Sequence, residues 1–194
     1  MRFVPRRFLP PAVLLAATAL LGTMLVTAAP PATAAPVTPA FGPAVDAYAA
    51  YAPQRTCDPT AKPGVVDVRD LLNRTYGTHS SGIGRACRTN TSEHYEGRAL
   101  DYSLNVTRPA DVTVANDVLA WLLATDRHGN PHAIARRLGV MYIIWNKRIW
   151  RAYRPGWGAY SCDGTPSGCH TNHIHISFSW AGARRQTTWW TARP

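Results

Sequence analysis

Six apolar residues in a row, Val140 to Trp145, predict a strand that is buried on both faces. The pair Asn146-Lys147 follows directly and favours a turn, after which Arg148-Ile149-Trp150 can run back along the first strand. A buried hairpin of this kind indicates an antiparallel sheet. Trp145 and Trp150 belong to its two strands and are expected to be core residues.

Helical and strand-like patterns alternate along the rest of the chain. The helical patterns cover Val65 to Tyr76, Thr113 to Thr125 and His132 to Leu138, and further strands are expected from Gly97 to Leu104 and from His173 to Trp180. The sequence therefore predicts an α+β domain in which helices pack on an antiparallel sheet.

The first 34 residues have the pattern of an export signal. Three arginines come first, an apolar run follows from Ala12 to about Val26, and Ala32-Thr33-Ala34 offers small residues for cleavage. An uncleaved membrane anchor is the alternative, but the run is shorter than the ~20 apolar residues that a spanning helix needs. We therefore expect a secreted protein, with no stable membrane span after cleavage, that can associate with a cell wall.

The remaining chain divides by composition into two parts. Residues 35–55 are rich in alanine, proline and tyrosine and carry little charge, which predicts a linker or wall spacer. Residues 56–194 contain the helical and strand patterns and form the predicted domain.

The chain is strongly basic. Residues 1–34 carry three basic residues and no acidic ones, so their removal lowers the formal charge from +10 to +7. A basic protein favours a polyanionic neighbourhood such as a bacterial wall, nucleic acid or anionic lipid. No RRM, KH or zinc-finger pattern is present, so nucleic acid is not the expected partner.

Four cysteines follow the predicted signal peptide: Cys57, Cys87, Cys162 and Cys169. An even number in an oxidising compartment predicts two disulfides, for which three connectivities exist. The short loop between Cys162 and Cys169 contains two glycines and a proline and favours a local bridge, which would leave Cys57 for Cys87. A zinc site made of all four cysteines is the alternative, although no C-x2-C pair is present.

Two segments, 92–101 and 170–175, contain the residues with metal-ligand chemistry. Residues i and i+2 of a strand share a face, so His173 and His175 should point into one site. On its own, a His-x-His pattern is most often a surface or packing feature. The first segment is what strengthens the metal interpretation.

That first segment supplies a histidine, His94, and a carboxylate, Asp101. Gly97 lies between them and allows a bend that returns the carboxylate to the imidazole. Two histidines and one carboxylate with an open fourth position are the ligand set of a catalytic zinc site. Iron, cobalt or nickel would also accept imidazole and carboxylate ligands.

The same segments resemble a known family. Ser92-x-His94-x-x-Gly97-x-Ala99-x-Asp101 matches the S-x-H-x-x-G-x-A-x-D signature of the zinc D-Ala-D-Ala peptidases, and His173-x-His175 resembles the half-motif shared with lysostaphin-type peptidases and hedgehog domains. The likeness covers roughly residues 56–180 and includes an actinobacterial group of secreted domains in this superfamily. It implies a hedgehog/DD-peptidase-like zinc fold.

The resemblance also implies roles for individual residues. The implied zinc ligands are His94, Asp101 and His175. His173 would lie beside the zinc ion as a base or transition-state stabiliser. In the family, an arginine on a strand before the serine-histidine motif pairs with developing oxyanion charge. Gly82-Ile83-Gly84-Arg85 resembles the segment that carries this arginine. Arg85 is therefore the candidate for this role, and Arg88 is the reserve candidate.

Other residues near the motifs receive simpler interpretations. Asn172 stands where many relatives have an aspartate, and it can orient a histidine without adding charge. Glu93 and Glu96 flank His94 and are interpreted as exposed acidic residues, with an outer-shell role as the alternative. Among the aromatic residues, Trp189 and Trp190 are the expected contacts for a ligand or the sheet edge.

These features predict a secreted zinc peptidase that hydrolyses amide bonds in peptidoglycan stem peptides, as an endopeptidase or a carboxypeptidase. Its partner would be peptidoglycan or another cell-wall polymer. A non-catalytic wall-binding module that keeps the zinc site is the alternative from a different class. A zinc-dependent nuclease is a more distant third.

Overall fold

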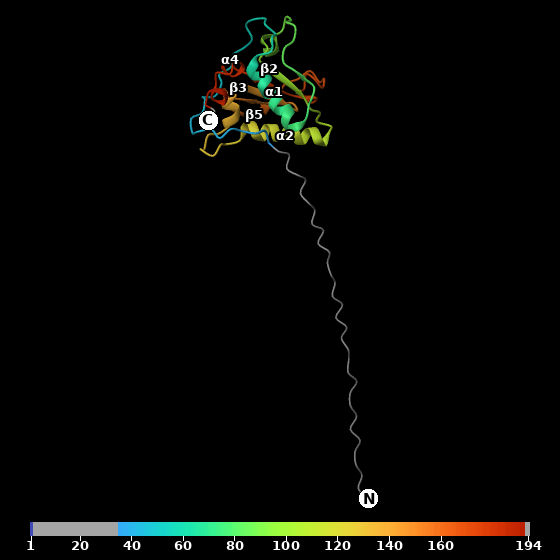
Figure 1. Cartoon of the computed structure of the whole chain (residues 1–194). Coiled ribbons are helices and arrows are strands. Elements are labelled where there is room, and N and C mark those ends of the chain that lie inside the picture. The colour runs from blue at the N-terminus through green and yellow to red at the C-terminus, as the bar shows by residue number, and fades with distance from the viewer. Residues whose placement is uncertain (2–34, 193–194) are drawn as a thin grey trace. The chain divides into compact units, whose positions relative to one another are not determined.

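Six antiparallel strands form a sheet with the spatial order β1-β2-β6-β3-β4-β5 (Figure 1). This arrangement comes from a computed structural model, which describes Met1 and residues 35–192. The predicted signal peptide falls on residues that, apart from Met1, lie outside the described ones. The strands are β1 (Ser81–Gly82), β2 (Ala99–Ser103), β3 (Val140–Trp145), β4 (Arg148–Arg151), β5 (Arg154–Ala159) and β6 (His173–Phe178).

Helices and short helical turns precede, join and follow the strands. They are α1 (Pro63–Tyr76), the 3-10 turn η1 (Glu93–Glu96), α2 (Pro109–Leu123), α3 (Ala133–Arg137), α4 (Trp180–Ala183) and α5 (Thr188–Thr191). The predicted α+β class with an antiparallel sheet is confirmed. Among the described residues, none of the helices combines the length and apolarity that a bilayer span requires.

The central hairpin forms as its sequence predicts. Asn146 and Lys147 both have positive φ angles, 46° and 62°, as two-residue hairpin turns require, and they join β3 to β4. Trp145 and Trp150 are 7% and 1% exposed, so their prediction as core residues is confirmed.

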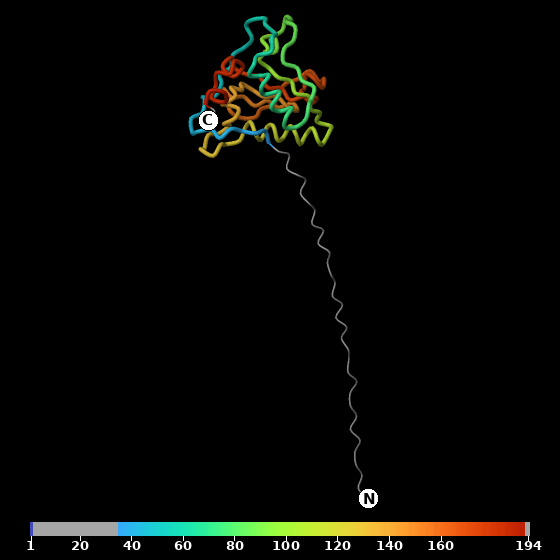
Figure 2. Tube along the Cα trace, in the orientation of Figure 1, coloured from blue at the N-terminus to red at the C-terminus, as the bar shows by residue number. Residues whose placement is uncertain are grey.

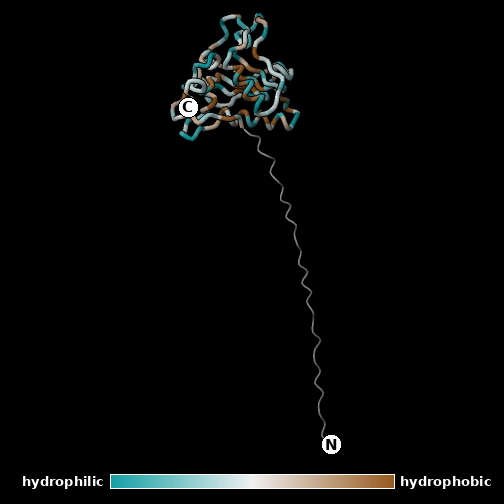
Figure 3. The backbone as a smooth tube through the Cα atoms, in the orientation of Figure 1, coloured by the Kyte–Doolittle hydropathy of each residue, from teal (hydrophilic) through white to brown (hydrophobic). Residues whose placement is uncertain are grey.

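The two faces of the sheet differ in chemistry. One face is apolar, and its residues on β2, β6 and β3 are fully buried: Leu100, Tyr102, Ile174, Ile176 and Ile143. They share the core with residues of α1 and α2, among them Val68 and Val118. Figure 3 shows apolar segments concentrated in the interior of the domain. Because side chains alternate along a strand, the opposite face is left for polar residues.

Residues 35–55, here called the N-terminal strap, are packed on the domain rather than forming the predicted linker. They contain no helix or strand, yet Phe41 is 6% exposed and its ring lies 5.4 Å from that of Trp189. Asp46 accepts a hydrogen bond from the Thr188 amide. Figure 2 shows the strap running along the domain beside the C-terminal segment. The linker prediction was wrong because a few apolar anchors outweigh the low-complexity composition.

The disulfides pair Cys57 with Cys87 and Cys162 with Cys169, which confirms the local bridge and leaves no free cysteine among the described residues.

The prediction that Trp189 contacts a ligand or the sheet edge is wrong, because this side chain is 3% exposed and belongs to the core. Trp190 is partly buried and donates a hydrogen bond from Nε1 to Asp67.

Candidate metal centre

Strand register brings the predicted residues to one place on the polar face of the sheet. Asp101 on β2 lies opposite His175 on β6, and Ser103 lies opposite His173. Antiparallel partners share a face, and so do residues i and i+2, so the three functional side chains point the same way. Asp101 and His175 are 74 positions apart in the chain.

His94 reaches the same place from the 3-10 turn η1. The Ser92 hydroxyl caps the turn by accepting from the His94 amide, and Gly97 ends it with a left-handed φ of 62°. The Gly97 amide in turn donates to the His94 carbonyl. The serine and the glycine of the motif therefore shape the backbone that presents the histidine, which is only 2% exposed.

Replacing Gly97 with alanine is expected to destabilise the fold by about 2 kcal/mol or more. A Cβ at this position would lie 2.0 Å from the Thr60 carbonyl oxygen, and the positive φ is unfavourable for any residue with a Cβ. Urea unfolding measures the change, with Gly129→Ala as the control. Gly129 also has a positive φ but has nothing near its Cβ position. Equal effects of the two substitutions would show that the close backbone contact is unimportant.

Three imidazole nitrogens converge on a single oxygen of Asp101. His175 Nδ1 lies 2.8 Å from Asp101 Oδ1, His94 Nε2 lies 3.1 Å from it, and His173 Nε2 lies 3.3 Å from it. With bonds of about 2.0–2.2 Å, two ligands on a tetrahedral zinc ion lie roughly 3.3–3.6 Å apart. The separations of His94 and His173 come close to that range, and that of His175 is shorter.

Hydrogen bonds on the far side of each ring determine which nitrogen is available. His94 Nδ1 is 2.6 Å from the Ile83 carbonyl oxygen, which can only accept, so this nitrogen carries the proton. In the neutral ring, Nε2 then presents a lone pair. It is buried and has no hydrogen-bond partner, although Asp101 Oδ1 is only 3.1 Å away. A lone pair facing a carboxylate oxygen is repulsive, so a cation between them would remove the conflict.

The His173 ring follows the same rule, whereas the His175 ring contacts a hydroxyl, which can donate or accept. His173 Nδ1 lies 2.8 Å from the amide oxygen of Asn172, and His175 Nε2 lies 2.9 Å from the Ser177 hydroxyl. Metal-binding histidines are oriented by such outer contacts. The contact between His173 Nδ1 and the Asn172 amide oxygen is the orienting contact predicted for Asn172. The donor set of His94, Asp101 and His175 therefore fits a metal ion, and imidazole with carboxylate suits zinc as well as other transition metals.

Charge and burial act in opposite directions on Asp101. Burial raises the pKa of its carboxyl group, but the facing imidazoles of His173, His175 and His94 outweigh burial and hold this pKa well below its usual range. Burial also lowers the pKa of His175, which Asp101 only partly offsets. An ionised carboxylate beside neutral imidazoles is the protonation state in which both act as metal ligands.

Arg85 contacts the other oxygen of the same carboxylate. Its Nη2 donates to Asp101 Oδ2, and its side chain is half exposed in the cleft. The structure thus places Arg85 at the site, with a positioning contact on Asp101 that the sequence does not predict. Its role toward an oxyanion stays a prediction. Arg88, the reserve candidate, is exposed and does not line the cleft.

The two glutamates beside His94 are buried, so the prediction that they are exposed is wrong. Glu93 is 5% exposed and accepts a hydrogen bond from the Tyr142 hydroxyl. The Tyr142 ring stacks on His175 at a centroid distance of 5.5 Å. Glu96 is 1% exposed and pairs with Arg98 at 2.7 Å. Glu93 therefore helps to hold the His175 ring through Tyr142.

A cleft of about 450 Å³ opens over the centre. One wall comes from the η1 region and the opposite wall from residues 160–170, where the Cys162–Cys169 disulfide closes the loop. His170 lies at the end of this loop, and its ring centroid is 4.7 Å from that of His173. The sequence places His170 near the site but assigns it no partner. Its contact arises from the tight loop that follows the disulfide.

Comparison with known proteins adds a family but no reaction. A family model described as "VldE, C-terminal domain" matches residues 57–174. The matched segment contains Arg85, His94, Asp101 and His173, and it ends one residue before His175. No curated protein and no solved structure matches the chain.

Proposed function

We propose that this chain, which belongs to the family described as "VldE, C-terminal domain", is a secreted zinc-dependent peptidase that acts on peptidoglycan stem peptides. The single observation that carries the proposal is the convergence of His94, His173 and His175 on Asp101 Oδ1 under an open cleft. We also propose that the sheet is of the hedgehog/DD-peptidase type. The motif at residues 92–101 and the His-x-His strand support this assignment.

His94, Asp101 and His175 would hold the ion. When bound, zinc supplies a Lewis acid and lowers the pKa of water to about 7, which suits attack on an amide carbonyl. Asp101 contributes the negative charge of the ligand set, and Arg85 keeps its second oxygen occupied. Three protein ligands would leave one coordination position for solvent or substrate, as in catalytic rather than structural zinc sites.

His173 is proposed as the group that moves a proton. Its Nδ1 is held by Asn172, so Nε2 is directed toward Asp101 and the cleft. From there it can accept a proton from the attacking nucleophile and return it to the leaving amine. Arg85 adds positive charge at the same cleft, where it favours a developing oxyanion.

The surroundings support a cell-wall substrate. The cleft lining is largely polar, with hydroxyl, amide and carboxylate groups such as Asn90, Thr165 and Asp163, and suits a peptide backbone. The formal charge of +7 that remains after removal of residues 1–34 favours retention on an anionic polymer. Two disulfides are typical of proteins in oxidising compartments and support the proposed export.

The test is digestion of purified cross-linked and pentapeptide muropeptides with the zinc-loaded protein. We expect new amide-derived fragments, and the His173→Ala variant should release them at least about 100-fold more slowly, as expected for loss of a general acid–base group. Sacculus binding by the same variant should be unchanged. Mass spectrometry identifies the cleaved bond and separates endopeptidase from carboxypeptidase products.

One result would favour the non-catalytic wall-binding module instead. In that case the protein would contain stoichiometric zinc and release no fragment from either substrate, while the wild type and His173→Ala would bind sacculi equally.

A further inference from the structure

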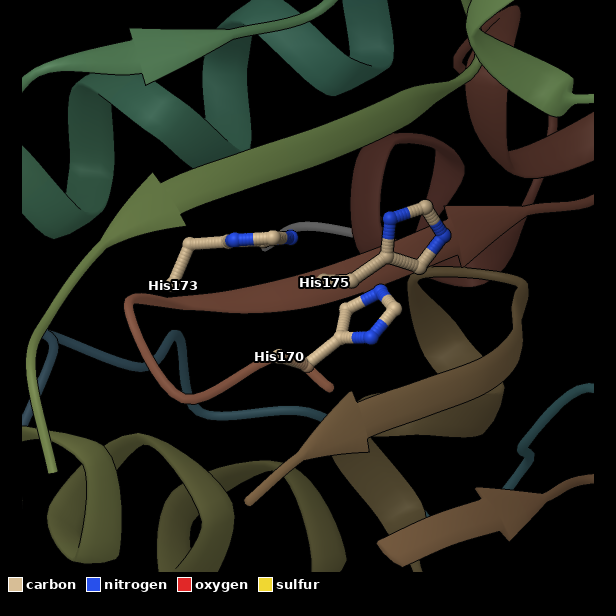
Figure 4. A group of neighbouring side chains, drawn as sticks. All are labelled: His170, His173 and His175. Atoms are coloured by element: carbon tan, nitrogen blue, oxygen red, sulfur yellow. The ribbon is translucent and has the colours of Figure 1, made fainter. Parts of the chain in front are cut away.

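A second group of potential metal ligands lies next to the first. One nitrogen from each of His170, His173 and His175 lies within 4.8 Å of the others. Figure 4 shows their three rings gathered at the start of β6 and the loop before it. Only His175 is shared with the group of His94 and Asp101. The proposed peptidase mechanism makes no use of His170.

The outer contacts of His170 match those of a metal-binding histidine. Its Nδ1 lies 3.2 Å from the Gly168 carbonyl oxygen and must donate to it. Its Nε2 is therefore the nitrogen that presents a lone pair in the neutral ring. Asn172 has the same effect on His173, so both histidines have their Nε2 atoms available while Nδ1 is held.

The position of His170 is tightly defined. The residue has a φ of 52°, a left-handed conformation that is unfavourable for a residue with a Cβ. Its carbonyl accepts from the Asn146 amide at 2.8 Å, and the Tyr160 ring packs edge-on against its imidazole. A buried imidazole on a left-handed backbone in a cleft is unusual for a purely structural residue.

We propose that His170 and His173 form a second position for a divalent transition-metal ion, beside the one held by His94, Asp101 and His175. Two imidazole nitrogens suit zinc, nickel or copper. Asp101 Oδ1 lies 3.3 Å from His173 Nε2 and thus contacts a histidine of each position. The second position is the weaker one, because its own ligands carry no negative charge and its carboxylate is shared.

Occupation of this position has a consequence for the site. An ion on His173 Nε2 removes the lone pair that would accept a proton, so excess zinc inhibits the protein. This consequence rests on the proposed peptidase function, whereas the binding itself does not.

The binding test is a titration of the metal-free full-length protein with zinc, followed by calorimetry and metal analysis after dialysis. The wild type is expected to bind two ions with clearly different affinities. His170→Asn should lose only the weaker event, and asparagine tolerates a left-handed φ, so the loop can keep its conformation. Asn172→Ala should weaken the same event by about 10–100-fold. His128→Ala, at an exposed histidine away from the cleft, is the control and should retain both events.

A single binding event in the wild type would overturn the proposal, and so would a second event that survives in both His170→Asn and Asn172→Ala. Loss of the tight event in His170→Asn would also overturn it, because His170 would then belong to the primary position. Two ions on a protein that cleaves no muropeptide would support the second position while rejecting the peptidase. In an active protein, inhibition by excess zinc should disappear in His170→Asn.

Discussion

Tight zinc binding should fall at least about 1,000-fold in the Asp101→Asn variant, and amide hydrolysis should fall with it. Loss of an outer-shell partner alone costs about 10–100-fold in metal affinity, and Asp101 is the charged member of the ligand set. Asparagine keeps the size of the side chain but removes the charge on which three imidazoles and Arg85 converge. Zinc competition with a chromophoric chelator measures the change in affinity.

Thermal unfolding gives an independent measurement. A ligand at about 1,000 times its Kd stabilises the folded state by about 4 kcal/mol, and a domain of this size gains about 2–4 °C in Tm per kcal/mol. Zinc should therefore raise the Tm of the wild type by about 8–16 °C and that of Asp101→Asn by little. Asp163→Asn is the matched control, because Asp163 lines the same cleft but is absent from both groups of potential ligands. If Asp101→Asn kept the full zinc-dependent increase, the ion would have to bind elsewhere.

The helices and the central hairpin are predictable because local signals agree with the tertiary structure. Pro63 and Gly77 mark the two ends of α1, and the Asn146-Lys147 pair forms the turn that joins β3 to β4. β1 and β5 are different. β1 has two residues, and β5 contains a proline and two glycines, so both depend on pairing with β2 and β4 rather than on their own sequences.

Part of the candidate site is predictable for the same reason. Spacing places His173 and His175 on one strand face, and the turn at Gly97 is encoded by a residue that tolerates a positive φ. The remaining contacts depend on residues remote in sequence. Buried Glu93 receives a hydrogen bond from Tyr142, 49 positions later, and nothing in the local composition indicates this. Composition favours exposure for a glutamate, and a tertiary partner reverses that preference.

The strap shows the same limit at the scale of a segment. Its alanine and proline content predicts a linker, yet its backbone supplies partners for a buried charged pair. The Ala52 carbonyl accepts from Arg98 Nη2 at 2.6 Å, and the Arg55 amide donates to Glu96 Oε1 at 2.8 Å. This buried pair belongs to the motif at residues 92–101, because Glu96 and Arg98 flank Gly97. The strap therefore helps to hold the turn that presents His94.

Arg98→Met should destabilise the fold by about 3–5 kcal/mol, the cost of removing one member of a buried ion pair. Arg98 is fully buried, donates to Glu96 Oε2 at 2.7 Å and also donates to the Phe178 carbonyl. Methionine fills part of the volume but leaves the Glu96 carboxylate without its cation. Urea unfolding at neutral pH measures the loss. Arg88→Met, at an exposed arginine, is the control and should change stability by less than about 0.5 kcal/mol.

The double variant Arg98→Met/Glu96→Gln separates charge from packing. Glutamine removes the uncompensated charge while its amide oxygen can still accept from the strap, so the double variant should be more stable than Arg98→Met alone. If it were less stable, the hydrogen bonds that the Glu96 carboxylate accepts from the Arg55 and Thr56 amides would outweigh the cost of its uncompensated charge. Because the pair lies directly before β2, its loss should also weaken zinc binding by shifting the turn that carries His94, although neither residue contacts the proposed ion.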